Sequence, residues 1–354
     1  MKKVLVIFGG VSSEHDVSTV SASNVIDNIP CKSYEVYSIG ITKDGEWYLY
    51  EGKSSLLPND KWVESGKCTK AIISPDRADG GILVFRKSGI EKIKIDAVFP
   101  VLHGKNGEDG AIQGFLELAG IPFVGCDMLS SACSMDKAIT NTLADDAKIS
   151  QAKWRAIDEY NYKKSQKEFV DEAIEYLGFP IFVKPANAGS SVGITKAKDK
   201  KELINGIDVA FSCDRKIVLE EFIDGVEVEC AVIGNNEPMA SVVGEIIPEN
   251  DFYDYESKYE SSISKLYIPA RLSLEKQNEV RTAAVAAFTA LSCSGLSRVD
   301  FFVRKSDGEV IFNEINTIPG FTEISMYPKL MEQSGVPYPK LLDRLFKLAI
   351  ARKE

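Results

Sequence analysis

The alternation of short apolar runs with longer amphipathic stretches predicts a mixed α/β chain. Residues Val4 to Phe8 are all apolar, two glycines follow them, and apolar residues then recur at helical spacing from Val17 to Ile29. A buried strand, a tight turn and a helix are the opening of an α/β unit. Further strands are predicted at 34–41, 95–102 and 122–124, and further helices at 130–147, 166–177 and 274–291.

Two long stretches lack this pattern. Residues 51–92 are polar and rich in turn residues, and they predict no definite element. Residues 248–269 are polar, carry several tyrosines and are too long for an ordinary connection. Because such a stretch is typical of a segment that closes over a site and excludes water, we expect 248–269 to form a lid loop.

A predicted hairpin near the C-terminus gathers oxygen ligands. Its strands are expected at 298–304 and 309–316, joined by the turn residues 306–308. A loop of this length places Asp300 opposite Glu314, and Asn316 shares their face because side chains two apart on a strand point the same way. Two carboxylates and an amide suit Mg²⁺ and offer nothing to zinc. By itself, the hairpin fits equally well with acidic side chains that only face water.

The most informative loop lies within the stretch Ile181 to Lys196, which has the pattern strand, Gly-Ser-Ser-Val-Gly, strand. Backbone N–H groups at Gly189 and Gly193, together with the hydroxyls of Ser190 and Ser191, are typical ligands of an anion. The pattern is not a Walker loop, because GxxxxGK[ST] is absent and a strand is expected to follow. It predicts either a hairpin that folds over phosphates or merely a flexible Gly-Ser hairpin.

Two further candidates stand directly after predicted strands, where α/β sheets place ligand groups. Glu14 lies in the turn after the first strand, and it is either a carboxylate favoured by the helix dipole or a ligand at the mouth of the sheet. His103 follows the strand 95–102 and is surrounded by glycines, which favours a loop built for close approach to a ligand. A histidine at a strand end can equally be a donor that stabilises the turn.

Composition narrows the class of protein. The chain has 354 residues, of which 44% are hydrophobic and 27% charged, so it is expected to be an ordinary soluble protein with two or three domains. Its net charge of -10 argues against nucleic acid or an anionic membrane as partner, and no apolar run is long enough to span a bilayer. The seven cysteines include no CxxC pair, which favours reduced thiols in the cytoplasm.

Four motifs together resemble one family. They are SSEHDVS at 12–18, LHGKNGEDGAIQG at 102–114, KPANAGSSVG at 184–193, and RVDFF followed by NEINTIPGFTEISMYP. In this order they closely resemble the D-alanine:D-alanine ligases of the ATP-grasp superfamily, over nearly the whole chain. The resemblance implies an α/β chain with α+β lobes: an N-terminal Rossmann-like α/β domain at 1–124, a central ATP-grasp lobe at 125–222 with the phosphate loop, and a C-terminal lobe at 223–354 with the lid and metal site. ATP is expected between the last two.

The resemblance also implies an activity. Enzymes of this family use ATP to phosphorylate the carboxylate of one D-alanine, and the amine of a second D-alanine displaces phosphate to give the dipeptide used in peptidoglycan. The residue types agree with this chemistry, because conversion to an acyl phosphate supplies the leaving group that a carboxylate lacks. Two Mg²⁺ ions are expected, which Mn²⁺ could replace, and relatives are commonly homodimers. The expected partners are therefore the small molecules D-alanine and ATP.

Individual positions take roles from the family's motifs. Glu14 would bind the first ammonium group, linked through Ser190 to Tyr259 of the lid, and Arg298 with the N–H of Gly320 would stabilise the oxyanion. The expected ATP-binding residues are Lys137, Lys184, Ser190, Ser191, Glu220, Glu221, Ile223 and Glu227, and the expected metal ligands are Asp300, Glu314 and Asn316. The expected substrate-binding residues are His103, Lys258, Ser325 and Met326, of which Lys258 and Ser325 would take the second carboxylate.

Several positions depart from the family's usual pattern. Asn141 stands where a basic residue is common, Ile324 stands where His is common, and 145–151 lacks the usual Gly-Ile-Pro. The amino-acid sequence of the lid also resembles that of ligases that accept D-serine, but Met326 and Tyr253 favour D-alanine. Two rivals therefore remain, a D-alanine:D-serine ligase and a non-catalytic nucleotide-binding regulatory protein on the same fold.

Overall fold

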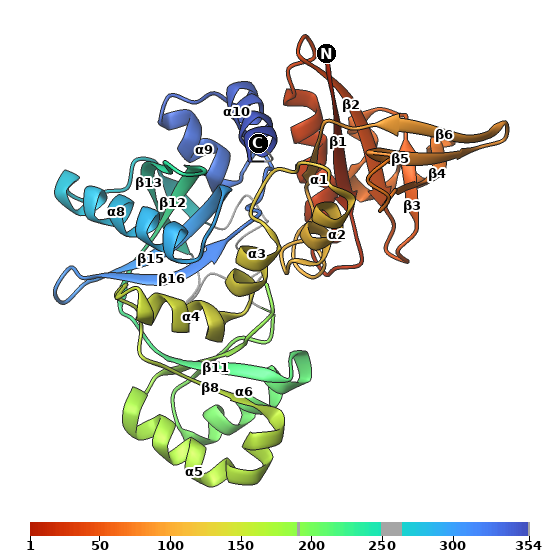
Figure 1. Ribbon diagram of the computed structural model, residues 1–354. Coiled ribbons are helices and arrows are strands. Elements are labelled where there is room, and N and C mark those ends of the chain that lie inside the picture. Colours follow the sequence, from red (N-terminus) through yellow and green to blue (C-terminus); the bar gives the residue numbers. More distant parts are fainter. Residues whose placement is uncertain (190–191, 249–263, 353–354) are drawn as a thin grey trace.

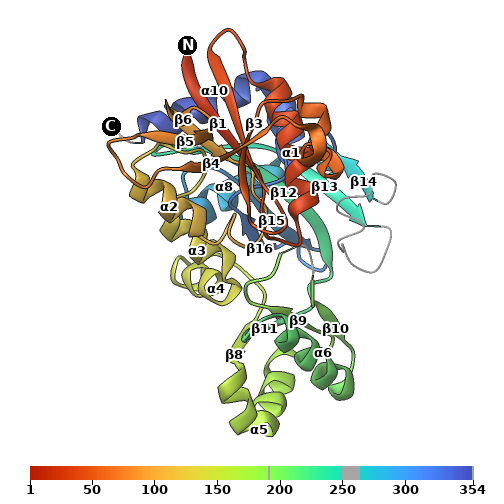
Figure 2. The ribbon, with the colours of Figure 1, turned by 90° about the vertical axis from the view of Figure 1, so that its right-hand side faces the viewer.

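Three β-sheets organise the chain, as the computed structural model shows for residues 1–189, 192–248 and 264–352 (Figure 1). The first sheet belongs to the N-terminal third, the second to the middle of the chain, and the third to the C-terminal part. The second sheet and its helices form the lower end of the molecule in Figures 1 and 2. Within the described ranges, no helix is long and apolar enough to cross a membrane.

The first sheet has seven strands in the order β6-β5-β4-β3-β2-β1-β7. The strands are β1 Lys2–Gly9, β2 Tyr34–Ile41, β3 Trp47–Tyr50, β4 Cys68–Ile73, β5 Gly81–Arg86, β6 Gly89–Lys94 and β7 Ala97–Pro100. Only β1, β2 and β7 pair in parallel, as in a Rossmann-like unit, and the remaining pairs are antiparallel. Helices α1 His15–Asn28 and α2 Ala111–Ala119 follow β1 and β7.

The expectation of no definite element at 51–92 was wrong. Strands β4, β5 and most of β6 lie there, together with three short 3-10 helices, Ser54–Leu56, Pro58–Asp60 and Val63–Ser65. The strands were hard to recognise because they form the outer part of the sheet and bury few side chains, and β6 buries only Ile93. A strand with one solvated face and a short apolar pattern has a weak sequence signal.

The second sheet has four antiparallel strands in the order β10-β9-β11-β8. Its elements are β8 Trp154–Asp158, β9 Ile181–Pro185, β10 Thr195–Ala197 and β11 Lys216–Glu221, with helices α5 Glu159–Leu177 and α6 Lys200–Cys213. Strands β9 and β10 pair on either side of the glycine- and serine-rich loop, which confirms the predicted strand, loop, strand pattern.

The third sheet has five antiparallel strands in the order β14-β13-β12-β15-β16. Its strands are β12 Gly225–Gly234, β13 Met239–Pro248, β14 Ser264–Tyr267, β15 Gly295–Arg304 and β16 Val310–Asn316. Helix α8 Leu274–Ala290 packs on β12, β13, β15 and β16, and helix α9 Met326–Gln333 packs on β12 and β13. The last helix, α10 Tyr338–Ala351, packs against β7 and joins the core of the first sheet.

The single helix expected at 130–147 is two helices, α3 Met128–Met135 and α4 Lys137–Asp146. Asp136 separates them, because its backbone is extended (φ -85°, ψ 102°) and its carboxylate accepts from the N–H groups of Ala138 and Ile139. It also forms an ion pair with Lys216 of β11. The break places Lys137 at the first position of α4, where its N–H donates to Ala186 O just after β9.

Candidate active site

The hairpin β15–β16 brings its three predicted oxygen donors together. Asp300 pairs with Glu314, Arg298 pairs with Asn316, and the amide of Asn316 donates to Asp300 Oδ2 at 3.1 Å. The pairing confirms the prediction, but the route differs. Farther out, Val303 pairs with Val310, so residues 305–308 form a four-residue loop and the register shifts between Asp300 and Phe301. The irregularity restores the pairing that a three-residue loop would have produced.

Arg298 lies between two carboxylates. Its guanidinium donates to both oxygens of Asp300, at 2.8 and 2.7 Å, and its Nε lies 3.0 Å from Glu229 Oε2 on the neighbouring strand β12. Although burial lowers it, the charges of Asp300 and Glu229 hold the pKa of Arg298 well above its usual value. The guanidinium is therefore a fixed positive charge with a defined orientation.

The donor set fits a magnesium ion. Asp300, Glu314 and Asn316 offer carboxylate and amide oxygens, which are the hard ligands that Mg²⁺ prefers, and Asp300 is buried. Glu314 and Asn316 line the cavity beside Asp300. The position of Arg298 is also compatible with a metal ion at this site. Its guanidinium does not depend on Asp300 alone, because Glu229 is a second acidic partner.

A second charge pair lies on the second sheet, and one of its members reaches the third sheet. Lys184 of β9 donates to Glu220 Oε2 of β11 at 2.6 Å and to Asn313 Oδ1 of β16 at 3.5 Å. Burial lowers the pKa of Lys184, but the carboxylate of Glu220 outweighs this effect and raises it overall. Lys137 donates to the carbonyl of Ala188 at 2.8 Å, just before Gly189. Lys184 thus stays positively charged, and Lys137 reaches the glycine- and serine-rich loop.

Two cavities meet at these residues. The larger one, of about 470 Å³, lies between the second and third sheets and is lined by the predicted nucleotide residues Lys137, Lys184, Glu220, Glu221, Ile223 and Glu227. The smaller one, of about 140 Å³, is lined by Glu14, His103, Arg298, Gly320, Ser325 and Met326. Lys137 and Glu314 line both cavities. Glu314, one of the candidate metal ligands, therefore lies at the junction of the two cavities.

Glu14 forms one wall of the smaller cavity and is 6% exposed. Two glycines permit its position, because a Cβ added at Gly104 would lie 2.3 Å from Glu14 Oε2 and one added at Gly189 would lie 2.8 Å from it. The turn that carries Glu14 therefore contacts both the loop after β7 and the glycine- and serine-rich loop. A larger residue at either position would displace the carboxylate.

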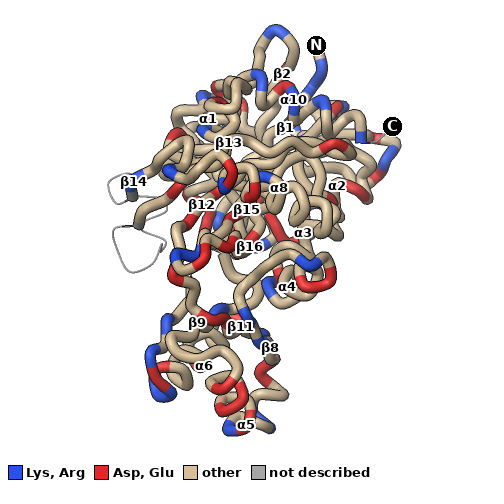
Figure 3. The backbone as a smooth tube through the Cα atoms, turned by 90° about the vertical axis from the view of Figure 1, so that its left-hand side faces the viewer, with Lys and Arg blue, Asp and Glu red and all other residues tan. Residues whose placement is uncertain are grey.

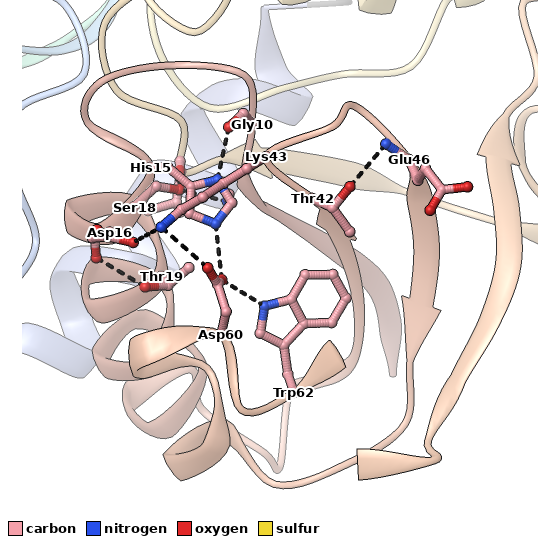
Figure 4. Close-up of polar contacts among 12 residues, drawn as sticks. Gly10, His15, Asp16, Ser18, Thr19, Thr42, Lys43, Glu46, Asp60 and Trp62 are labelled. Carbon is pink, nitrogen blue, oxygen red and sulfur yellow. Dashed lines mark hydrogen bonds and ion pairs between the residues drawn. The ribbon is translucent and has the colours of Figure 1, made fainter. Parts of the chain in front are cut away.

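The turn before Glu14 is anchored by the neighbouring residue, His15 (Figure 4). Its Nδ1 lies 2.7 Å from Gly10 O, and its Nε2 lies 2.9 Å from Asp60 Oδ1. Asp60 also accepts from the Trp62 indole and pairs with Lys43. Lys43 pairs with both Asp16 and Asp60 and so balances their acidic charge. The contacts among His15, Asp16 and Asp60 are therefore explained by support of the turn.

His103 is buried in the wall of the smaller cavity, and both of its ring nitrogens have partners. Nδ1 lies 3.1 Å from Ile318 O, so it carries the proton, and Nε2 lies 3.1 Å from Ser21 Oγ. Burial lowers the pKa of His103, although the charge of Glu14 opposes this. The side chain lies at the predicted place but contacts protein groups on both sides, as the turn-stabilising alternative expects.

The loop after β16 supplies the remaining substrate-side groups. Ser325 Oγ accepts from the N–H of Thr322 at 3.0 Å and shares a hydrogen bond with its hydroxyl at 2.8 Å, so the chain folds back over Gly320. Met326 is buried beside them and contacts Gly244 of β13. The predicted residues Ser190, Ser191, Tyr253, Lys258 and Tyr259 lie outside the described residues.

Reasoning from the sequence missed three residues of the site. Glu229 supports Arg298, Asn313 accepts from Lys184, and Glu108 lines the smaller cavity. Glu108 accepts from the N–H groups of Gly104 and Ile318 at 2.8 and 3.3 Å, and burial together with the charge of Glu14 raises its pKa to about 8. The period of two residues along β12 puts Glu229 on the same face as Glu227, and this alternation is the signal that could have found it.

Departures from the family pattern also have a structural setting. Asn141, where a basic residue was expected, donates to Glu220 Oε1 at 3.3 Å and lines both cavities. Ile324, where His was expected, lines the smaller cavity. At 145–151, Gln151 closes the end of α4 by donating to Asn141 O and Asp145 Oδ1.

The fold and the site define the class: three sheets, a glycine- and serine-rich hairpin and paired cavities of the ATP-grasp type. Comparisons give the family. The family model described as "D-ala D-ala ligase N-terminus" matches residues 3–126, and "D-ala D-ala ligase C-terminus" matches 143–347. The chain belongs to the D-alanine–D-alanine ligase family.

Individual relatives agree over nearly the full length. A D-alanine–D-alanine ligase from Acetivibrio thermocellus is 50% identical over 362 residues, which cover 99% of this chain and 96% of the relative. One from Caldicellulosiruptor bescii is 49% identical over 99% of this chain and 95% of the relative. Among solved structures, the VanG D-Ala:D-Ser ligase from Enterococcus faecalis has a TM-score of 0.89 at 46% identity, covering 98% of this chain and 99% of that one. The D-alanine-D-alanine ligase from Coxiella burnetii has a TM-score of 0.88 at 35% identity, covering 99% and 94%.

Proposed function

We propose that this protein uses ATP to join two D-alanine molecules through an acyl phosphate, giving D-alanyl-D-alanine for peptidoglycan. The observation that carries the proposal is the meeting of two cavities at Glu314 and Lys137, with Arg298 beside them. A nucleotide in the larger cavity would direct its terminal phosphate towards a small acid in the smaller one. Curated relatives at 50% and 49% identity carry the name of this activity.

In the larger cavity, the chain's own groups suit a nucleotide triphosphate. Lys137 and Lys184 supply positive charge for the phosphates, and Glu227 supplies a carboxylate for the ribose. Glu220, Glu221 and Ile223 form the segment where β11 ends, and they are proposed to take the adenine largely through backbone groups. Ser190 and Ser191 are proposed to cover the transferred phosphoryl group.

In the smaller cavity, groups of opposite charge are proposed to bind different parts of the substrates. Glu14 is proposed to bind the ammonium group of the first D-alanine. Arg298 and the N–H of Gly320 are proposed to stabilise the oxyanion that forms when the second amine attacks, because donors already in place act most strongly on developing charge. Ser325 and Lys258 are proposed to hold the second carboxylate, and the Ser190–Tyr259 link is proposed to close the site. His103 is proposed to contribute to substrate binding as part of the wall of the smaller cavity.

Asp300, Glu314 and Asn316 are proposed to hold two Mg²⁺ ions, with Mn²⁺ as a possible replacement. When bound, the metal would neutralise charge on the terminal phosphates during transfer. The chain's contribution is a set of oxygen donors whose orientation is fixed by the β15–β16 pairing and by Arg298.

D-Alanine is proposed as the second substrate in preference to D-serine. Met326 and Ile324 line the smaller cavity with apolar side chains, which offer no hydrogen bond to a serine hydroxyl. The relatives named above support this choice, although the similar VanG structure is a D-Ala:D-Ser ligase. We also propose a homodimer located in the cytoplasm, and lobes divided at about residues 124 and 222.

The test is a competition assay. The purified protein is incubated with ATP, Mg²⁺ and equal concentrations of D-alanine and D-serine, while ADP release is followed and the dipeptides are identified by mass. We expect amino-acid-dependent ADP release with D-alanyl-D-alanine as the main product, and none when Mg²⁺ is omitted. Exclusive formation of D-alanyl-D-serine would overturn the choice of substrate, and nucleotide binding without ADP release would favour the regulatory alternative.

A further inference from the structure

Ile318, in the loop after β16, is held at both its N–H and its carbonyl by the N-terminal part of the chain. The N–H of Ile318 donates to Glu108 Oε1 at 3.3 Å, and the carbonyl of Ile318 accepts from His103 Nδ1 at 3.1 Å. Glu108 and His103 both belong to the loop between β7 and α2, more than 200 residues earlier in the chain. These contacts therefore join two parts of the molecule that are folded around different sheets.

The same loop is held again just beyond Gly320. The N–H of Phe321 donates to Ser21 Oγ at 3.2 Å, and the carbonyl of Phe321 accepts from Asn24 Nδ2 at 3.4 Å. Ser21 also faces His103 Nε2 at 3.1 Å, and it is the donor there because Nδ1 carries the ring proton. Gly320 thus lies between two residues, Ile318 and Phe321, that side chains of the N-terminal part of the chain hold in place.

Glu108 links this loop to the amino-acid side of the site. Its second oxygen, Oε2, accepts from the N–H of Gly104 at 2.8 Å, and Gly104 is the glycine that contacts the Glu14 carboxylate. One carboxylate therefore spans the loop beside the first substrate's ammonium site and the loop that carries the proposed oxyanion donor. Each oxygen of the Glu108 carboxyl group thus accepts from a different N–H group, one in each loop.

We propose that Glu108 is a positioning residue for the peptide-forming step: it sets the Gly320 N–H against Arg298 by fixing the N–H of Ile318 relative to the Gly104 loop. This inference rests on the proposed function, because it assigns Glu108 to the oxyanion that the second amine generates. Donors of this kind lose effect when they are misplaced by about 1 Å, which can cost on the order of 100-fold in rate. The step before it, phosphoryl transfer, does not form that oxyanion.

The variant Glu108→Gln separates the two steps. A glutamine has one acceptor oxygen, so it places an NH₂ group against one of the two N–H donors while it keeps the size of the side chain. We expect the turnover number for dipeptide formation to fall about 10- to 100-fold, as expected for a shifted oxyanion donor. We expect KM for ATP to stay within about twofold, since the larger cavity is remote from these contacts.

Phosphoryl transfer is measured by itself through positional isotope exchange in ATP that carries ¹⁸O at the β–γ bridge, with D-alanine present. Glu108→Gln should retain this exchange within about threefold of wild type, because the oxyanion site is not used in that step. A variant that merely disorders the Gly104 loop would instead raise KM for the first D-alanine and suppress the exchange as well.

Asp109→Asn is the matched control. Asp109 is the next residue, it also accepts from backbone N–H groups of the same loop (Asn106 and Ala111), and it does not line the smaller cavity. This variant should keep both steps near wild type. Thermal melting of all three proteins confirms that they are folded before the rates are compared.

The outcomes are distinct. If wild type forms dipeptide and Glu108→Gln does so equally fast, or if exchange and ligation fall together, the positioning role is wrong. If the wild-type protein shows no D-alanine-dependent ADP release, the proposed function is wrong. The inference about Glu108 then fails as well, whatever the variant shows.

Discussion

At the scale of single residues, the charges of the candidate site are set in pairs by neighbouring strands. Arg298 on β15 lies between Glu229 on β12 and Asp300 on its own strand, and Lys184 on β9 is balanced by Glu220 on β11. Each pair is largely buried, so neither member could keep its charge and orientation alone. The pairing fixes where positive charge is presented to a ligand.

Glu229→Gln tests this balance. The amide keeps the size of the side chain but no longer offsets the charge of Arg298, so Arg298 should be drawn more strongly onto Asp300, a proposed metal ligand. We expect turnover to fall about tenfold and the free energy of unfolding to fall by about 1–3 kcal/mol. Steady-state kinetics and denaturant unfolding measure the two effects.

The control for this prediction is Glu309→Gln at the outer end of the same hairpin. Glu309 pairs with Arg304 in a more exposed position, at 2.6 Å. An exposed pair contributes little, so this variant should behave like wild type within about 0.5 kcal/mol. Equal losses in both variants would contradict the special role of Glu229.

At the scale of elements, the break between α3 and α4 connects a local signal to the nucleotide cavity. Asp136 caps α4 with its side chain and so fixes the first helical residue, Lys137, whose ammonium group reaches Ala188 O. An aspartate before a helical run is a familiar N-terminal signal, but here it lies within a longer pattern that resembles one helix. The cap, rather than a turn residue, ends one helix and begins the next.

Asp136→Ala should therefore affect both stability and the nucleotide. Loss of the cap is expected to lower the free energy of unfolding by about 1–2 kcal/mol, and a shifted Lys137 should raise KM for ATP several-fold. Asp199→Ala is the matched control, because Asp199 caps α6 in the same way, through Lys201 and Glu202, away from both cavities. If the control raises KM equally, the cap has no specific link to Lys137.

At the scale of the whole molecule, the two ends of the chain share one core. The C-terminal helix α10 packs against β7, and Phe346 lies fully buried with its ring 5.0 Å from that of Tyr34 and 6.3 Å from that of Phe99. Lysines and arginines are interspersed with acidic residues along the chain rather than gathered on one face in the view of Figure 3. The first sheet is thus held to the C-terminal part of the chain by apolar packing as well as by the contacts around Gly320.

Phe346→Ala tests this shared core. Removing a fully buried aromatic side chain should lower the free energy of unfolding by about 3–5 kcal/mol. Phe85→Ala, at a side chain that is 42% exposed on the outer part of the first sheet, should cost far less. Thermal melting compares the stability of the two variants. Similar losses of stability in Phe346→Ala and Phe85→Ala would show that α10 adds little to the core of the first sheet.

Several features could be predicted from the sequence because they depend on local pattern. The continuous apolar run of β1 predicts a buried strand. The strands on either side of the glycine- and serine-rich loop and the face shared by Asp300, Glu314 and Asn316 follow from turn signals and from the period of two residues along a strand. The short outer strands at 68–94 gave too weak a pattern, and the cap at Asp136 was hidden within an apparently continuous helix.

The sequence by itself determined the family, the class of fold and the residue types of the site, because motifs and side-chain chemistry are written locally. Only the tertiary structure decided which distant groups meet. Glu229 reaches Arg298 across 69 positions and Glu108 reaches Ile318 across 210. In the hairpin β15–β16, the register shift compensates for the four-residue loop and restores the pairing of Asp300 with Glu314, which is visible only in the paired strands. Contacts of this kind depend on topology and packing, and periodicity along one segment carries no information about them.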